Sequence, residues 1–353
     1  MTRLASISTF AAALMFATSA VAQVSATPPA AQKSEPEKPA AKPKTKPHTV
    51  TKKPPATEAK SSTPTPAATA APAPDDPNVD LVYGAYQRGK YKTAFDLATV
   101  RARAGDPKAM TMLGELYANE LGVRRDDAKA VEWYKRAADA GDREAMFALA
   151  MMRIAGRGAP ADRLEAVKLL AAAAKLGEPK AAYNLALLYL DGQTLPQDLK
   201  RAAELLRMAA DAGSPEAQYA LATFYKEGTG VEKDLEKAVR LLQAAALADN
   251  VDAEVEYAIA LYNGTGTPKN QPAAVALLRK AAHQNSPIAQ NRLARVLVTG
   301  QGAPMDKIEG LKWHVIAKTS GKGDLFLDEA FAQLSPEDRA KVEDAARRWL
   351  NVK

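Results

Sequence analysis

The run of sequence that decides the fold spans residues 217–246 and reads AQYALATFYKEGTGVEKDLEKAVRLLQAAA. Its first half, beginning at Ala217, alternates small and large apolar residues at helical spacing, so a helix is expected there. Gly228 and Gly230 then interrupt the pattern. Asp234 follows them and precedes a second periodic segment, as the N-cap residue of a new helix would. This stretch therefore predicts two helices joined by a glycine-containing loop.

The same unit recurs every 36 residues in six consecutive copies, with no insertion or deletion between them. An alanine begins the first helix of every copy. Four residues later comes leucine, or tyrosine in one copy, and the next residue is always glycine or alanine. Residues at this spacing share one face of a helix, and the small one lets a second helix approach to about 8–10 Å. The alanines that set the register are Ala109, Ala145, Ala181, Ala217, Ala253 and Ala289.

The loops and the second helices keep this register as well. Paired glycines follow the first helix in most copies, where backbone angles closed to other residues are expected. Residues suited to the N-cap of the second helix then stand at Asp126, Asp162, Asp198, Asp234, Asn270 and Asp306. A loop glycine or the closing glycine of a copy is replaced at Glu120, Thr194, Asp249 and Asn285. Two helices per copy and no strand pattern predict an all-α fold, an α/α solenoid of stacked helix pairs.

The segments that flank the six copies have the features of caps. Residues 79–105 read as a copy with a shortened loop. The period ends after Gly321, and a last helix that begins near Pro336 would cover the open end of the stack. We therefore expect about seven 36-residue helix-pair repeats over residues 78–321, followed by capping helices over residues 322–353.

The N-terminal residues 1–22 have the pattern of a secretory signal peptide. Arg3 supplies a positive charge, an apolar stretch begins at Leu4, and the small-x-small form that signal peptidase accepts ends at Ala22. Cleavage is predicted after Ala22, which would place the protein in the periplasm or outside the cell. An uncleaved membrane anchor is the alternative, although this stretch is marginal for a hydrocarbon core of roughly 30 Å.

A proline- and lysine-rich linker is predicted over residues 23–77, which contain 13 of the 23 prolines. With almost no large apolar side chains, this segment cannot bury enough surface to offset the entropy of ordering, so disorder is expected. The chain before Asp75 has nine basic and three acidic residues, a net charge of +6, whereas the remainder has 39 and 38, a net charge of +1. The basic pI therefore reflects the linker and does not indicate a nucleic-acid-binding domain. Such a run of lysines most often keeps a linker solvated, and weak contact with anionic lipid or an anionic cell-wall polymer is the alternative.

The repeated unit resembles a known family. In the fourth copy, AQYALA at residues 217–222, GTG at residues 228–230 and KA at residues 237–238 are similar to the Sel-one-like repeat, a relative of the tetratricopeptide repeat. The resemblance implies a right-handed superhelix and scaffold or adaptor roles, often in bacterial envelope proteins. Some exported members of this family restrain membrane sensor kinases, and others assist envelope assembly or polysaccharide export.

The tetratricopeptide resemblance also implies where a protein partner would bind. In its register, the positions two, six, nine and ten residues after the repeat alanine face a concave groove. They correspond to Phe147, Met151, Tyr183, Leu187, Asp191, Tyr219, Glu227, Tyr262, Asn263 and Arg295. Such an aromatic, amphipathic groove suits an extended or helical peptide. The alternative is that these rings pack against the next repeat, and spacing alone does not separate lining from packing.

No constellation of residues in the sequence predicts catalysis. Cysteine is absent, and the three histidines are His48 in the linker, His283 and His314. His314 stands at a register where other copies carry Tyr134 or Leu170, which favours a packing role. No metalloprotease, phosphate-loop, nucleophile-elbow or dinucleotide motif occurs. We therefore expect no enzyme activity, no cofactor and no metal site.

Two functional hypotheses follow. The first is a non-enzymatic periplasmic scaffold or regulator that binds an envelope protein, such as a membrane sensor or a morphogenetic complex, through its repeat groove. The second is a cell-wall or envelope-associated protein that is held by its basic linker, with the repeats as a spacer. Deleting residues 23–77 separates the two. Partner binding survives under the first hypothesis, whereas envelope association is lost under the second.

Overall fold

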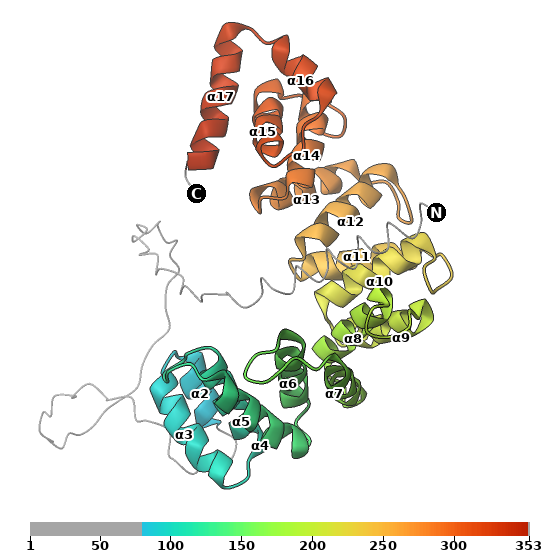
Figure 1. Cartoon of the computed structure of the whole chain (residues 1–353). Coiled ribbons are helices and arrows are strands. Elements are labelled where there is room, and N and C mark those ends of the chain that lie inside the picture. The colour runs from blue at the N-terminus through green and yellow to red at the C-terminus, as the bar shows by residue number, and fades with distance from the viewer. Residues whose placement is uncertain (1–79, 352–353) are drawn as a thin grey trace, which may run out of the picture. The chain divides into compact units, whose positions relative to one another are not determined.

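The computed structural model of the protein describes residues 80–351, which form sixteen helices and no strand (Figure 1). The predicted signal peptide (residues 1–22) and linker (residues 23–77) lie outside the described residues. In the described part of the chain, no helix has the length and apolar composition needed to cross a membrane.

The helices come in pairs whose bounds follow the 36-residue register. A short pair, α2 (Leu81–Gln87) and α3 (Tyr91–Arg103), precedes six regular pairs, in which the first helix is named an A helix and the second a B helix. The A helices are α4 (Pro107–Ala118), α6 (Arg143–Ala155), α8 (Pro179–Asp191), α10 (Pro215–Glu227), α12 (Val251–Asn263) and α14 (Pro287–Thr299). The B helices are α5 (Asp127–Asp139), α7 (Arg163–Lys175), α9 (Leu199–Asp211), α11 (Leu235–Leu247), α13 (Gln271–His283) and α15 (Lys307–Thr319). The last two helices are α16 (Leu325–Ala332) and α17 (Pro336–Asn351).

Each helix of the pairs packs on the helices next to it in the sequence, so the pairs stack in chain order (Figure 1). Alanine and leucine supply most of the core between them, and the six alanines that set the register are at most 2% exposed. At the C-terminal end, α16 packs on α14 and α15, and α17 packs on α15. The prediction of an all-α solenoid of helix pairs with further C-terminal helices is confirmed.

The predicted N-cap residues of the B helices are also confirmed. In every regular pair this side chain accepts a hydrogen bond from the backbone N–H three residues later, as Asp234 does from Lys237 at 2.9 Å. Five of the A helices have a similar side-chain cap, and only Glu178, before α8, forms none. Because these caps satisfy N–H groups that have no partner inside the helix, they fix where each helix begins.

The departures from the glycine pattern leave the backbone conformation unchanged at three of the four positions. Glu120, Asp249 and Asn285 have φ angles of 58°, 60° and 69°, which lie in the left-handed region. Thr194, the fourth, does not adopt a positive φ. The left-handed conformation costs most L residues about 1–2 kcal/mol, and asparagine and aspartate tolerate it best. The repeat therefore imposes a glycine-like backbone on three other residues, of which Glu120 is the least suited.

Replacing Glu120 with glycine is expected to stabilise the protein. Relief of the left-handed strain is partly offset by the greater freedom of glycine in the unfolded chain, which leaves a net gain of about 0.5–1 kcal/mol. Urea unfolding followed by circular dichroism measures the change. Asn285→Gly is the matched control and should gain less, because asparagine tolerates this conformation. A Glu120→Gly protein no more stable than the wild type would contradict the prediction.

The second loop glycine of a pair lies against the preceding pair. In three pairs, a Cβ atom at this position would come inside contact distance of a carbonyl oxygen that belongs to the first residue of the preceding B helix. The glycines and the residues whose carbonyl groups they face are Gly158 with Asp127, Gly230 with Leu199, and Gly266 with Leu235. The close approach, in addition to the positive φ, therefore requires glycine here.

An arginine between the loop glycines links the first two regular pairs. Arg157 Nη2 lies 2.7 Å from Asp127 Oδ1 and donates to the Ala118 carbonyl oxygen at 3.0 Å. Arg125 Nη2 lies 3.0 Å from the other oxygen of the same carboxylate. Hydrogen bonds from Arg157 and then Arg125 lower the pKa of Asp127 to about 2. The ionised carboxylate is thus held by two cations, one of which comes from the neighbouring pair.

Acid is expected to weaken this link between pairs. Since the pKa of Asp127 falls from 3.8 to about 2 on folding, its contribution to stability is fully present above about pH 4 and is lost as the pH falls through about 2. Asp127→Asn should therefore lower the melting temperature at about pH 5 and have little effect near pH 2. Thermal unfolding across this range measures the difference, with Asp139→Asn at the exposed end of α5 as control. An Asp127→Asn effect that does not change with pH would contradict the assignment.

Candidate protein-binding surface

Half-buried apolar side chains recur on one side of the A helices, at positions two, six and nine residues after the register alanine. At this spacing they form a stripe along each helix. We name this surface the A-face, and its apolar members are Phe147, Met151 and Ile154 of α6, Tyr219 of α10, and Ile259 and Tyr262 of α12. Because each is only partly covered by the core, each leaves apolar surface open to a partner.

The structure divides the ten residues predicted to line a groove. Tyr183 and Leu187 are 6% and 3% exposed and belong to the hydrophobic core that spans α6 to α10. The reason is the apolar composition of α8, in which eight of 13 residues are buried, so packing and not lining describes these two side chains. The half-buried residues are Phe147, Met151, Asp191, Tyr219 and Tyr262, and the exposed ones are Glu227, Asn263 and Arg295. Binding of a partner by these eight stays a prediction.

Carboxylates lie beside the tyrosines of neighbouring A helices. Burial, followed by the charges of Asp252 and Glu256, raises the pKa of Tyr219 to about 12. Burial and the nearby Glu256 carboxylate likewise raise the pKa of Asp252. Lys226 forms an ion pair with one of these carboxylates, since its Nζ lies 3.0 Å from Glu256 Oε2. The A-face at α10 and α12 therefore combines a partly buried ring with acidic groups.

Two of the predicted groove residues are engaged by elements that follow them in the chain. Arg295 pairs with Asp324, the N-cap residue of α16, through Nε and through Nη2 at 2.9 Å, and its guanidinium lies 5.5 Å from the centroid of the Phe326 ring. Tyr262 donates its hydroxyl proton to the Gln301 carbonyl oxygen at 3.0 Å. A ligand at either position would compete with these contacts.

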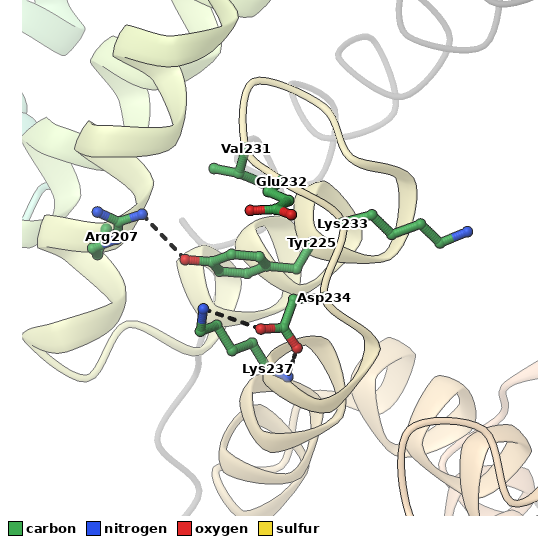
Figure 2. A pocket seen from close by; sticks show the side chains of 7 residues that line it. All are labelled: Arg207, Tyr225, Val231, Glu232, Lys233, Asp234 and Lys237. Carbon is green, nitrogen blue, oxygen red and sulfur yellow. Dashed lines mark hydrogen bonds and ion pairs between the residues drawn. The ribbon is translucent and has the colours of Figure 1, made fainter.

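A second candidate site is a pocket of about 450 Å³ that sequence reasoning did not single out (Figure 2). It is lined by Arg207 of α9, Tyr225 of α10, residues 231–234 of the loop that follows, and Lys237 of α11. Arg207 Nη2 donates to the Tyr225 hydroxyl at 3.1 Å. Lys237 Nζ lies 3.0 Å from Asp234 Oδ2 and 5.4 Å from the centroid of the Tyr225 ring. A tyrosine is thus flanked by two cations.

The sequence signal for this pocket is a combination of residue types at three registers. Arg207 comes from the third pair, and Tyr225 and Lys237 come from the fourth; no other two consecutive regular pairs have a basic residue, a tyrosine and a basic residue at these positions. One repeat earlier, for example, these positions hold Ala171 of α7 and Tyr189 of α8. Since the other pairs fold without this combination, the repeat fold does not require it.

Among residues 80–351, no group of three or more histidine, aspartate or glutamate side chains is placed to hold a metal ion. His314 is 1% exposed, and its Nε2 lies 2.9 Å from Asp328 Oδ1 of α16. This contact ties the B helix α15 to the C-terminal helices, as a packing position with a polar tip would.

Comparison with protein families agrees with these repeat boundaries. The Sel1 repeat matches six consecutive segments, residues 107–142, 143–178, 179–214, 215–250, 251–286 and 287–321. The chain belongs to the Sel1 repeat family. Each matched segment contains one A helix and one B helix, so the repeat of the family is the helix pair seen in the structure.

Two solved structures are similar to this Sel1 repeat chain. A Sel1 repeat protein from Oxalobacter formigenes is 27% identical with a TM-score of 0.61, and the match covers 68% of this chain and 98% of that one. The protein c5321, a protective antigen of uropathogenic Escherichia coli with an SLR fold, is 25% identical with a TM-score of 0.52, covering 74% of this chain and 64% of that one. No curated protein sequence matches the chain. Sel1 repeat proteins commonly mediate protein–protein interaction and are generally non-enzymatic.

Proposed function

We propose that this Sel1 repeat protein is a non-enzymatic scaffold of the bacterial envelope that binds a partner protein on its A-face. The observation that carries the proposal is the recurrence of half-buried apolar side chains at equivalent positions of α6, α10 and α12. Partly exposed aromatic side chains are the residue type that most often anchors a protein partner. Regular spacing along stacked helices suits an extended or helical segment.

The charges of the A-face favour a partner segment with basic residues beside its apolar anchors. Glu216, Asp252 and Glu256 lie near the tyrosines of α8 and α10, and of these three carboxylates Glu256 is paired with Lys226. Lysine or arginine side chains of a partner would be attracted to these carboxylates, and such attraction affects specificity and association rate more than affinity. A membrane sensor or a morphogenetic complex is the class of envelope partner that we propose.

The location in the envelope rests on the sequence. The positive charge of Arg3, the apolar stretch after it and the cleavage site at Ala22 support export of the chain. The alternative, retention by the basic linker, is favoured by the net charge of +6 that nine basic and three acidic residues give the chain before Asp75. Both proposals make the repeat array extracytoplasmic, and they differ in which part of the chain makes the functional contact.

Photo-crosslinking from defined positions tests the proposed surface. A photoreactive amino acid is placed at Met151 of the A-face or at Thr223, the half-buried residue at the equivalent position of α10. The control positions are the exposed Lys168 and Gln243 on the B helices α7 and α11. We expect one envelope protein to crosslink from both A-face positions and from neither control. Crosslinks from all four positions, or from none, would contradict the proposal.

A second arm of this experiment separates the A-face from the linker. Deleting residues 23–77 should leave the A-face crosslinks in place if the repeats bind the partner. Loss of the crosslinks together with loss of envelope association would favour retention by the linker instead.

A further inference from the structure

The pocket between α9, α10 and α11 contains cations that the fold itself does not neutralise. Within residues 80–351, Arg207 has no carboxylate partner and donates only to the hydroxyl of Tyr225. Lys233 also lacks a carboxylate partner in this part of the chain, and Figure 2 shows its side chain extending away from Arg207. Both side chains are exposed to solvent, so their N–H groups are available for charge-assisted hydrogen bonds to an anionic ligand.

The carboxylates in the pocket limit how much negative charge it accepts. Both oxygens of the Asp234 carboxylate already have partners. One accepts the backbone N–H of Lys237 and caps α11, and the other forms an ion pair with the Lys237 side chain. Glu232 lines the pocket as well, so its residues comprise three cations and two carboxylates, a net charge of +1. A single negative charge would be balanced there, whereas a dianion would be repelled by Glu232.

We propose that this pocket binds one carboxylate group of a partner protein, with Arg207 and Tyr225 as the direct contacts. The guanidinium group of Arg207 donates to the carboxylate in the planar geometry that arginine offers such groups. The Tyr225 hydroxyl accepts from Arg207 and has its own proton free to donate to the same ligand. Lys237, 5.4 Å from the ring centroid, adds positive charge behind the ring.

This site uses side chains different from those of the A-face, so it is a second point of contact that goes beyond the proposed function. Its volume of about 450 Å³ is within the range of roughly 300–1,000 Å³ found for small-ligand pockets. The carboxylate would come either from an aspartate or glutamate side chain or from a C-terminus. Both sources present the same planar monoanion.

Titration of the ¹⁵N-labelled full chain with three tripeptides tests the site and distinguishes the sources. Acetyl-Gly-Glu-Gly-amide carries only a side-chain carboxylate, acetyl-Gly-Gly-Gly carries only a terminal one, and acetyl-Gly-Gln-Gly-amide carries neither. We expect saturable shifts of the signals from residues 231–237 with one or both acidic peptides and none with the glutamine peptide. Shifts from the glutamine peptide of the same size, or no shifts with any peptide, would overturn the proposal.

Substitutions then assign the contacts. Arg207→Gln should weaken binding about tenfold or more, which is the loss expected for a hydrogen bond to a charged group. Glu232→Gln removes the like charge and should strengthen binding. Arg240→Gln, an exposed change on α11 outside the pocket, should change the dissociation constant by less than about twofold. Binding unaffected by Arg207→Gln, or inorganic phosphate that binds more tightly than either acidic peptide, would overturn the assignment to a carboxylate.

Discussion

Gly230→Ala should lower the free energy of unfolding by about 3 kcal/mol, because a side chain at this position has two separate costs. The first is the left-handed backbone, with a φ of 66°. The second is the carbonyl oxygen of Leu199, which a Cβ atom would meet inside contact distance. A backbone carbonyl at the start of a helix cannot rotate away as a side chain can, so the loop or the helix must shift.

Gly213→Ala is the control that separates these costs. Gly213, like Gly230, has a positive φ, here 89°, but no atom lies within 4 Å of a Cβ atom built at this position. Alanine at this site should therefore cost only the backbone strain, about 1 kcal/mol or less once the reduced entropy of the unfolded chain is included. Urea unfolding gives both values, and hydrogen exchange in α9 to α11 shows whether the loss is local. Equal effects of the two substitutions would refute the role of the close contact.

Gly114→Ala is expected to destabilise the protein by about 2 kcal/mol, although alanine is the better helix former by about 1 kcal/mol. The reason is Tyr134 of the partner B helix, because a Cβ atom on Gly114 would lie 2.6 Å from the Cδ1 and Cε1 atoms of its ring. That ring is 3% exposed, and its hydroxyl donates to Glu115 Oε2 at 3.0 Å, so it has little freedom to move. The position of the Tyr134 ring on α5 therefore explains why α4 has glycine at residue 114.

The other repeats supply the compensating change. Four of them combine alanine at the register of Gly114 with leucine at the register of Tyr134, as Ala222 and Leu242 do. The double variant Gly114→Ala, Tyr134→Leu should therefore be more stable than the sum of the single effects predicts, with a coupling energy of about 2 kcal/mol. Strictly additive effects in a double-mutant cycle by urea unfolding would contradict this account.

The sequence predicted the parts of the fold that every repeat shares. The register alanines, the N-cap residues such as Asp162 and the glycine loops are local requirements, so each appears at its own position in the chain. Their repetition at 36 residues made the helix pairs predictable without any long-range information. Even Glu120 and Asn285, which lack the expected glycine, keep the conformation that the register indicates.

The candidate sites were less predictable because they depend on several elements at once. Position two of the A helix is half-buried at Phe147 and Tyr219 but 6% exposed at Tyr183. That difference arises from the apolar composition of α8, which the register does not set. The pocket residues Arg207 and Tyr225 lie on different helices, and charged or polar surface residues at such separations carry no periodic signal. The signal that could have identified the pocket is a comparison of the copies at fixed register, because only the third and fourth regular pairs together show this combination.

The contact between a loop glycine and the preceding B helix gives the array a direction. Gly158, Gly230 and Gly266 each rest on a carbonyl group contributed by the pair that comes earlier in the chain. As the polypeptide emerges from its N-terminus, the B helix that each of these three loops contacts has therefore been synthesised before the loop itself. Growth of the folded stack can therefore keep pace with the arrival of the chain, one pair at a time.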